Sequence, residues 1–170
     1  LSYYEHINLS NASLEKSDLY RKSDNEFNLE SNLEIDNETY DSVILFNTLE
    51  HIENYKNLIS EISRILNSGG KLEIFVPFLL YYHPDPKDFF RPTHAYLKKI
   101  LESNGFEVKI NLIGTGAFIA SYQNLYRYLK LPILKTLFFI IFDTLNKILD
   151  KFSKDHWKYY CGVHATCIKK

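Results

Sequence analysis

Short apolar runs alternate with a helical pattern between residues 41 and 113, and this alternation constrains the fold more than any other feature of the sequence. Ser-Val-Ile-Leu-Phe follows Asp41, and Leu-Glu-Ile-Phe-Val occupies residues 72–76 before Pro77. Such runs suit strands that are buried on both faces, as in a parallel sheet. The pattern between them predicts a helix, so this region is expected to form a strand, a helix and a strand.

The first predicted helix begins near Asn54 and has one apolar stripe at a spacing of three or four residues. We expect the segment Asn67-Ser68-Gly69-Gly70 to end it, because glycine adopts the left-handed conformation of a helix C-terminus without strain. Thr93 is a suitable N-cap for a second helix, which Gly105 would close before a strand over residues 106–113. The stripe of the first helix consists of Leu58, Ile59, Ile62, Ile65 and Leu66.

Strands that alternate with helices at this spacing predict right-handed crossovers and a mostly parallel sheet covered on both faces, which is an α/β fold. The length of 170 residues suits one domain, so residues 1–170 are interpreted as a single domain. Further strands are expected at residues 1–9 and 26–31. A last strand over residues 162–168 would add to the edge of the sheet.

Residues 118–152 are predicted to form an unusually aromatic helical insertion before the last strand. Its apolar run is interrupted by Lys135 and Asp143, so it is a poor candidate for a membrane-spanning helix. A helix that is apolar nearly all round must be buried somewhere. Three roles remain open: a place in the domain core or a homodimer face, a lid over a substrate pocket, or peripheral membrane contact through residues 131–152.

The charge balance argues against a nucleic-acid partner. Twenty Lys and Arg residues against 21 Asp and Glu residues give a net charge of −1, and the basic residues form no stripe interleaved with aromatic ones. The two cysteines, Cys161 and Cys167, would lie too far apart along one strand for a disulfide, which fits a reducing compartment. Because the N-terminus also lacks a signal-peptide pattern, we expect a cytoplasmic protein.

Three segments carry a family resemblance. Tyr40-Asp41-Ser42-Val43-Ile44 leads into Asn47-Thr48-Leu49-Glu50-His51-Ile52, and the helix that follows ends in Arg64-Ile65-Leu66-Asn67-Ser68-Gly69-Gly70. This succession is similar to the second half of class I S-adenosylmethionine-dependent methyltransferases of the type 11 kind, in which the turn after the fourth strand reads LEH and the next helix ends in RxLxxGG. The resemblance implies a Rossmann-like sheet and S-adenosylmethionine as the cofactor.

A second motif narrows the resemblance. His83-Pro84-Asp85-Pro86 followed by Asp88-Phe89-Phe90-Arg91-Pro92-Thr93 resembles a stretch of methyltransferases associated with cell-surface polysaccharide and other glycan pathways. It implies a small-molecule or glycan-precursor acceptor. If the acceptor is a hydroxyl, His83 is the first choice for the base and Asp88 for the residue that orients it. Tyr82 and Arg91 are expected to bind the acceptor.

The position of these motifs favours a ligand site. In open α/β sheets, ligands bind outside the carboxyl ends of the strands, where residues 47–51 and 77–91 are expected to converge. Structural roles remain open for the same residues. Asp88 and Arg91 suit a local ion pair, His83 could cap the loop, and Glu50 and His51 could organise the turn. Glu61 and Arg64 are interpreted as solvated helix-face charges, and no metal site is expected because the histidines lack ligand spacing.

The chain departs from the family at its front end. Gly69 is the first glycine, so the glycine-rich turn after the family's first strand is missing. The acids that contact ribose and adenine align with Asn8 and Asn28. The absence of Met and of this turn leads us to expect a fragment of a longer enzyme, and a shortened, inactive relative is the alternative. The cofactor-binding residues implied by the resemblance are Asn8, Asn28, Leu29, Asn47, Thr48, Leu49 and His51.

Two functions therefore remain open. The first is methyl transfer to a small molecule or glycan precursor. The second is a non-catalytic methyltransferase-like module that mediates assembly or membrane association through its aromatic helices.

Overall fold

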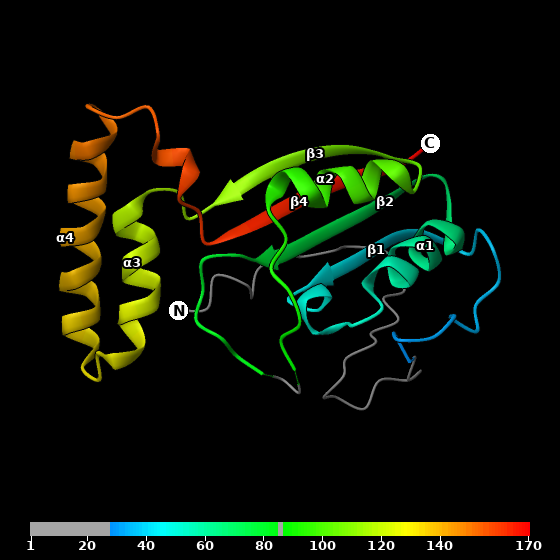
Figure 1. Ribbon diagram of the computed structural model, residues 1–170, viewed down its shortest axis with the longest axis horizontal. Helices are drawn as coiled ribbons and strands as arrows, with labels where there is room; N and C mark the ends of the chain where they lie inside the picture. Colours follow the sequence, from blue (N-terminus) through cyan, green and yellow to red (C-terminus); the bar gives the residue numbers. More distant parts are fainter. Residues whose placement is uncertain (1–27, 85–86) are drawn as a thin grey trace.

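Four strands form one mixed sheet in the computed structural model, which describes residues 28–84 and 87–170 (Figure 1). The strand order is β1-β2-β4-β3, with β1 parallel to β2 and β4 antiparallel to both β2 and β3. This confirms the Rossmann-like α/β class but corrects the expectation of a mostly parallel sheet. The strands are β1 Tyr40–Phe46, β2 Leu66–Pro77, β3 Phe106–Ile113 and β4 Gly162–Lys169.

The last strand was expected to add to the edge of the sheet, and this prediction is wrong. β4 lies between β2 and β3, where Ala165 pairs with both Ile74 and Ile110. Its alternating residues Val163, Ala165 and Cys167 are fully buried. An alternating pattern predicts one buried face, but it does not say whether a strand is central or at an edge.

The N-terminal strand predictions are settled only in part. Residues 1–9 lie outside the described residues. The described part of the segment 26–31 is a turn, in which the backbone N–H of Ser31 donates to the carbonyl of Asn28 at 3.2 Å. The short strand predicted there is therefore wrong over residues 28–31.

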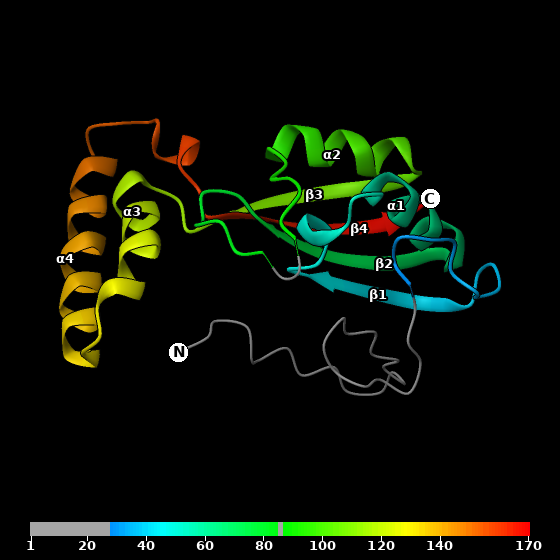
Figure 2. The ribbon, with the colours of Figure 1, turned by 60° about the horizontal axis from the view of Figure 1, so that its bottom comes forward.

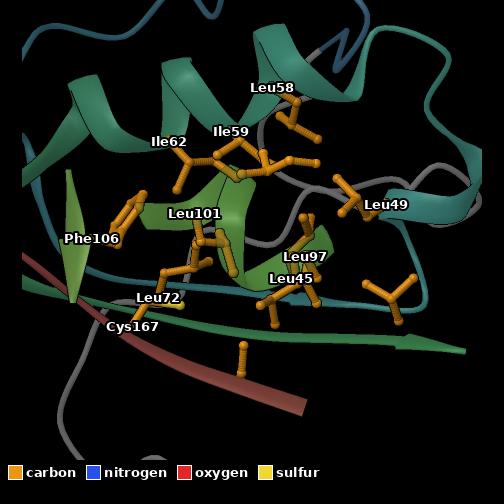
Figure 3. Close-up of a cluster of buried hydrophobic side chains, with 14 of the residues drawn as sticks. Leu45, Leu49, Leu58, Ile59, Ile62, Leu72, Leu97, Leu101, Phe106 and Cys167 are labelled. Carbon is orange, nitrogen blue, oxygen red and sulfur yellow. The ribbon is translucent and has the colours of Figure 1, made fainter. Parts of the chain in front are cut away.

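Helices α1 (Tyr55–Ile65) and α2 (His94–Ser103) pack on the same face of the sheet (Figure 2). The described helices therefore cover one face near the site rather than the two faces expected. Apolar side chains from both helices interlock with the strands below them (Figure 3). This core includes Leu58, Ile59 and Ile62 of α1, Leu97 and Leu101 of α2, and Leu45, Leu72, Phe106 and Cys167 of the strands.

Helix α1 ends without the glycine cap that the sequence suggested. Leu66 is already extended, and β2 runs through Asn67 to Gly70. Gly69, at φ 76°, instead serves a register shift at the start of β2, between the pairs Tyr40–Leu66 and Ser42–Lys71. The glycines thus shape the start of a strand. A glycine in the left-handed conformation suits an irregular strand as well as a helix end.

Two charged residues of α1 are not solvated as predicted. The Glu61 carboxylate accepts a hydrogen bond from the backbone N–H of Leu33 at 2.8 Å, and Arg64 donates to the carbonyls of Leu33 and Ile35. Arg64 and Glu61 also pair with each other at 2.8 Å. They hold the segment that precedes β1 against α1, which sequence spacing alone does not reveal.

The predicted insertion is a helical hairpin at one end of the sheet (Figure 1). Helix α3 (Ala117–Leu125) leads through the short helix η2 (Tyr126–Tyr128) into helix α4 (Pro132–Asp150), and the short helix η3 (His156–Lys158) precedes β4. The helical prediction is confirmed, but a place in the domain core is wrong, because Asn146 is the single buried residue of α4. None of the helices in residues 28–84 and 87–170 combines the length and hydrophobicity needed to cross a membrane.

The N-cap of α2 provides a test of the fold. Thr93 accepts a hydrogen bond from the backbone N–H of Tyr96 at 3.3 Å. We expect Thr93→Ala to lower the free energy of unfolding by about 1 kcal/mol, because it leaves this N–H without its partner. Urea denaturation measures the change. Thr93→Ser is the matched control, and an equal loss in both variants would contradict the capping role.

Candidate functional site

The turn that follows β1 has an unusual backbone conformation. Asn47 adopts φ 50°, in the left-handed region, and its N–H donates to the carbonyl of Phe75 at 3.1 Å. Thr48 closes the turn by donating its hydroxyl to the carbonyl of Phe46 at 3.0 Å. The chain then forms a short helix, η1 (Leu49–His51), whose three side chains are buried. The turn therefore leaves Asn47 exposed at the end of the strand.

The loop that follows β2 is held by an ion pair. Arg91 donates two hydrogen bonds to the carboxylate of Asp88, one from Nε at 2.9 Å and one from Nη2. The Arg91 guanidinium holds the pKa of the Asp88 carboxyl below its ordinary value, and the Asp88 carboxylate also accepts the backbone N–H of His83 at 3.3 Å. The predicted ion pair is thus present, and it fixes the backbone of the loop at His83.

The turn and the loop meet, as the positions of their strands predicted. His51 Nδ1 lies 2.6 Å from the carbonyl of Lys87, and the backbone N–H of Phe89 donates to the carbonyl of Glu50 at 2.8 Å. The rings of His51 and His83 are in edge-to-face contact, with centroids 5.2 Å apart. Because a carbonyl can only accept, Nδ1 of His51 carries the hydrogen and its Nε2 presents a lone pair.

Glu50 is at the centre of this junction. Its side chain is fully buried, and Oε1 lies 3.8 Å from Nε2 of His51 and 3.7 Å from Nε2 of His83. Neither carboxyl oxygen has a hydrogen-bond partner among the described residues. Burial raises the pKa of Glu50 from 4.5 to about 7, although its own backbone N–H, His51 and Arg91 act in the opposite direction.

The sequence pattern indicated only that Glu50 organises the turn, and it did not indicate the central position of this side chain. A carboxyl among Leu49, His51 and Ile52, shortly after a buried strand, was the available signal. Such a group must be protonated, paired or hydrated to be tolerated in the interior. The Glu50 carboxyl can therefore gain or lose a proton near neutral pH beside the imidazoles of His51 and His83.

The same three side chains are close enough to be considered as metal ligands. One ligand atom from each of Glu50, His51 and His83 lies within 4.8 Å of the others. However, Nη2 of Arg91 lies 3.0 Å from Nδ1 of His83, and a guanidinium can only donate. Nδ1 of His83 also lies 3.3 Å from the carbonyl of Tyr81, which can only accept, so these contacts fit either tautomer, and Nε2 faces Glu50. The positive charge of the Arg91 guanidinium beside this ring disfavours the binding of a further cation.

The remaining predicted residues lie in different surroundings. Tyr82 is 69% exposed and free to contact a ligand, whereas Leu29 and Leu49 are buried in the core. Asn28 is used locally, since its side-chain oxygen accepts the backbone N–H of Glu30 at 3.0 Å. Asn8 lies outside the described residues. The structure thus brings together Thr48, His51, His83, Asp88 and Arg91 but buries two side chains that the resemblance implied for cofactor contact.

The raised pKa of Glu50 predicts a pH-dependent stability. The folded protein binds the proton of Glu50 more tightly than the unfolded chain, so this carboxyl becomes destabilising as the pH rises from about 4.5 to about 7. Glu50→Gln stays neutral, and we expect its thermal stability to gain on the wild type between pH 5 and pH 8. The full difference is on the order of 3 kcal/mol.

Glu61→Gln is the matched control for this experiment. Arg64 holds the pKa of Glu61 below its ordinary value, so the contribution of Glu61 is already complete above about pH 5 and is lost only as the pH falls. The stability deficit of Glu61→Gln should stay constant from pH 5 to pH 8. A constant difference for Glu50→Gln as well would show that Glu50 titrates normally.

Comparison with known proteins supports the family resemblance. Residues 3–74, less than half of the chain, match a family model described as a methyltransferase domain. No curated protein matches the sequence at a significant level. In all, 142 chains of solved structures are similar to this chain.

Three solved structures illustrate the similarity. A methyltransferase dependent on S-adenosylmethionine from Archaeoglobus fulgidus is 19% identical with a TM-score of 0.51, and the match covers 80% of this chain and 62% of that one. A possible histamine N-methyltransferase from Thermotoga maritima is 13% identical with a TM-score of 0.52, and the match covers 85% and 63%. The [4+2]-cyclase SpnF is 16% identical with a TM-score of 0.51, and the match covers 85% and 54%.

These similarities define the fold and the extent of the match. The chain spans between 54% and 63% of the lengths of these three proteins. Because one of them is described as a cyclase, the shared fold alone does not specify a reaction. The chain therefore shares a Rossmann-like fold with these proteins, and its residues 3–74 are similar to a methyltransferase domain, as the motifs in residues 40–70 indicated.

Proposed function

We propose that this protein transfers a methyl group from S-adenosylmethionine to a small-molecule or glycan-precursor acceptor. The junction of the turn after β1 with the loop after β2 is the observation that carries the proposal. It lies at the carboxyl ends of two parallel strands, where open α/β sheets bind ligands. The family match over residues 3–74 and the loop motif at residues 83–93 support the cofactor and the acceptor class, respectively.

The turn after β1 would hold the cofactor. Its sulfonium supplies an already activated methyl group, so the protein chiefly aligns the acceptor and excludes water. Asn47 offers an exposed amide, and Thr48 keeps the turn in shape through its bond to Phe46. Since the side chain of Leu49 is buried, only its backbone is available for a cofactor contact.

The loop after β2 would bind the acceptor and hold its proton. His83 is partly exposed, and Tyr82 is exposed beside it. Both ring nitrogens of His83 already face polar partners, Arg91 at Nδ1 and Glu50 at Nε2. We assign the uptake of an acceptor proton to Nδ1 of His83, where the acceptor hydroxyl would replace Arg91 as the partner, while Nε2 keeps its hydrogen toward Glu50. The ion pair of Asp88 with Arg91 fixes the position of the loop.

We also propose a cytoplasmic location and a role in polysaccharide biosynthesis. Cys161 and Cys167 are free and buried, and burial raises the pKa of the two thiols to about 11 and about 12. Such unreactive thiols are compatible with a reducing cytoplasm. The loop motif supports a role in polysaccharide biosynthesis, and nothing in the charge pattern favours a nucleic-acid acceptor.

A second candidate function is a non-catalytic module for assembly or membrane association. The large exposed apolar surface of α4 favours it. Cofactor binding separates the two candidates, because a module without activity has no need to hold S-adenosylmethionine.

Calorimetric titration with S-adenosylhomocysteine tests the proposal. We expect micromolar affinity for the wild type. Asn47→Gly keeps the left-handed backbone and removes only the amide, so its affinity should fall about three- to tenfold. His83→Gln is the control on the acceptor side and should keep the wild-type affinity. A folded wild type that gives no heat would favour the non-catalytic module.

A further inference from the structure

One side of helix α4 exposes a continuous set of large aliphatic side chains. We call this set the α4 apolar face: Ile133, Leu134, Leu137, Ile140, Ile141, Leu145 and Ile148. Ile133 is 76% exposed, and the others are between 36% and 55% exposed. Successive members are separated by one, three or four residues, so they lie on one side of the helix over most of its length. Soluble monomers rarely present a contiguous apolar surface of this kind without a partner.

The opposite side of α4 is already occupied. Phe142 contacts Phe118 edge to face, with ring centroids 5.9 Å apart, and Phe139 contacts Tyr122 at 5.5 Å. Tyr122 also donates its hydroxyl to the carbonyl of Lys135 at 3.1 Å. These contacts fix α4 against α3. The α4 apolar face therefore points away from α3, and these contacts hold it in that orientation.

The charges around the hairpin are predominantly positive. Residues 127–158 contain seven Lys and Arg residues and three Asp residues. Two of the acids are paired with lysines, Asp143 with Lys147 at 2.7 Å and Asp155 with Lys158 at 2.9 Å, and Asp150 lies 4.0 Å from His156. Within the described ranges, no acidic partner is found for Lys130 before α4 or for Lys151 and Lys154 after it. Both ends of the helix thus offer cations to an anionic partner.

We propose that the α4 apolar face docks onto the surface of a bilayer that contains anionic phospholipids, with α4 lying in the plane of the interface. An amphipathic helix binds there through its buried apolar area and through the attraction of flanking cations to anionic headgroups. Exposed aromatic side chains just beyond α4, Phe152 and Trp157, suit the headgroup region. A second copy of the chain would bury the aliphatic side chains equally well but would bring the unpaired lysines of two hairpins together.

This docking would place the candidate site beside the membrane. The hairpin lies at the end of the sheet where β1 and β2 finish (Figures 1 and 2). It contacts the loop after β2 directly, since Asn124 donates to the carbonyl of Leu79 at 3.1 Å and the guanidinium of Arg127 lies 3.9 Å above the Tyr81 ring. The Tyr81 ring in turn contacts His83. This step rests on the proposed function. If the protein transfers a methyl group, its acceptor is a lipid-carried molecule whose polar head reaches the loop from the bilayer surface.

Vesicle co-sedimentation of the whole chain tests the docking. We expect binding to vesicles of phosphatidylcholine with phosphatidylglycerol, weaker binding to phosphatidylcholine alone, and loss of binding as salt rises. Leu137→Glu places a carboxylate on the α4 apolar face and should weaken binding at least about tenfold. Thr136→Glu is the matched control, because this exposed neighbour points to a different side of α4 and adds the same charge.

Each outcome decides the proposal. Equal weakening by the two variants, or no vesicle binding by a folded monomer, would overturn it. So would light scattering that shows a wild-type dimer which Leu137→Glu converts to a monomer. Titration of Leu137→Glu with S-adenosylhomocysteine keeps the two proposals apart. Retained cofactor affinity with lost vesicle binding supports docking, and absent cofactor affinity with retained vesicle binding defeats only the methyltransferase proposal.

Discussion

The parallel pairing of β1 with β2 is the constraint on which the rest of the site depends. It sends the turn at residues 47–51 and the loop at residues 78–92 out of the sheet at one edge. Two contacts then join them, from the backbone N–H of Phe89 to the carbonyl of Glu50 and from His51 to the carbonyl of Lys87. Without the pairing, the buried carboxyl of Glu50 would lack the imidazole of His83 beside it. The chemistry of the junction is therefore a consequence of sheet topology.

Local patterns predicted most of the elements because hydrophobic periodicity and caps act over a few residues. The strands at β1, β2 and β3, the capped helix α2 and the helical hairpin all follow from such patterns. The central position of β4 did not, since strand order is decided by pairings between residues far apart in sequence. The glycines before Lys71 were misassigned for a related reason: glycine permits a left-handed backbone without saying which element needs it.

The site could be located from the sequence, but its internal arrangement could not. Motif positions at the ends of two strands were enough to predict that residues 47–51 and 77–91 would converge. They did not indicate that Glu50 would be the fully buried group at this junction, or that Arg91 would occupy one nitrogen of His83. Such assignments need distances and hydrogen-bond partners. The hairpin was ambiguous in the same way, because an apolar helix can cover a core, a partner or a lipid surface, and its exposure distinguishes them.

A crystal structure of the protein with S-adenosylhomocysteine would show directly whether the turn after β1 and the loop after β2 form the cofactor site. We predict that the ligand lies against the turn at Asn47 and Thr48, with its sulfur facing the loop that carries His83. The two contacts between turn and loop should be intact, and the carboxyl of Glu50 should remain enclosed by both imidazoles. A ligand bound elsewhere on the sheet would contradict this position of the cofactor. A loop separated from the turn when the ligand is bound would contradict it as well.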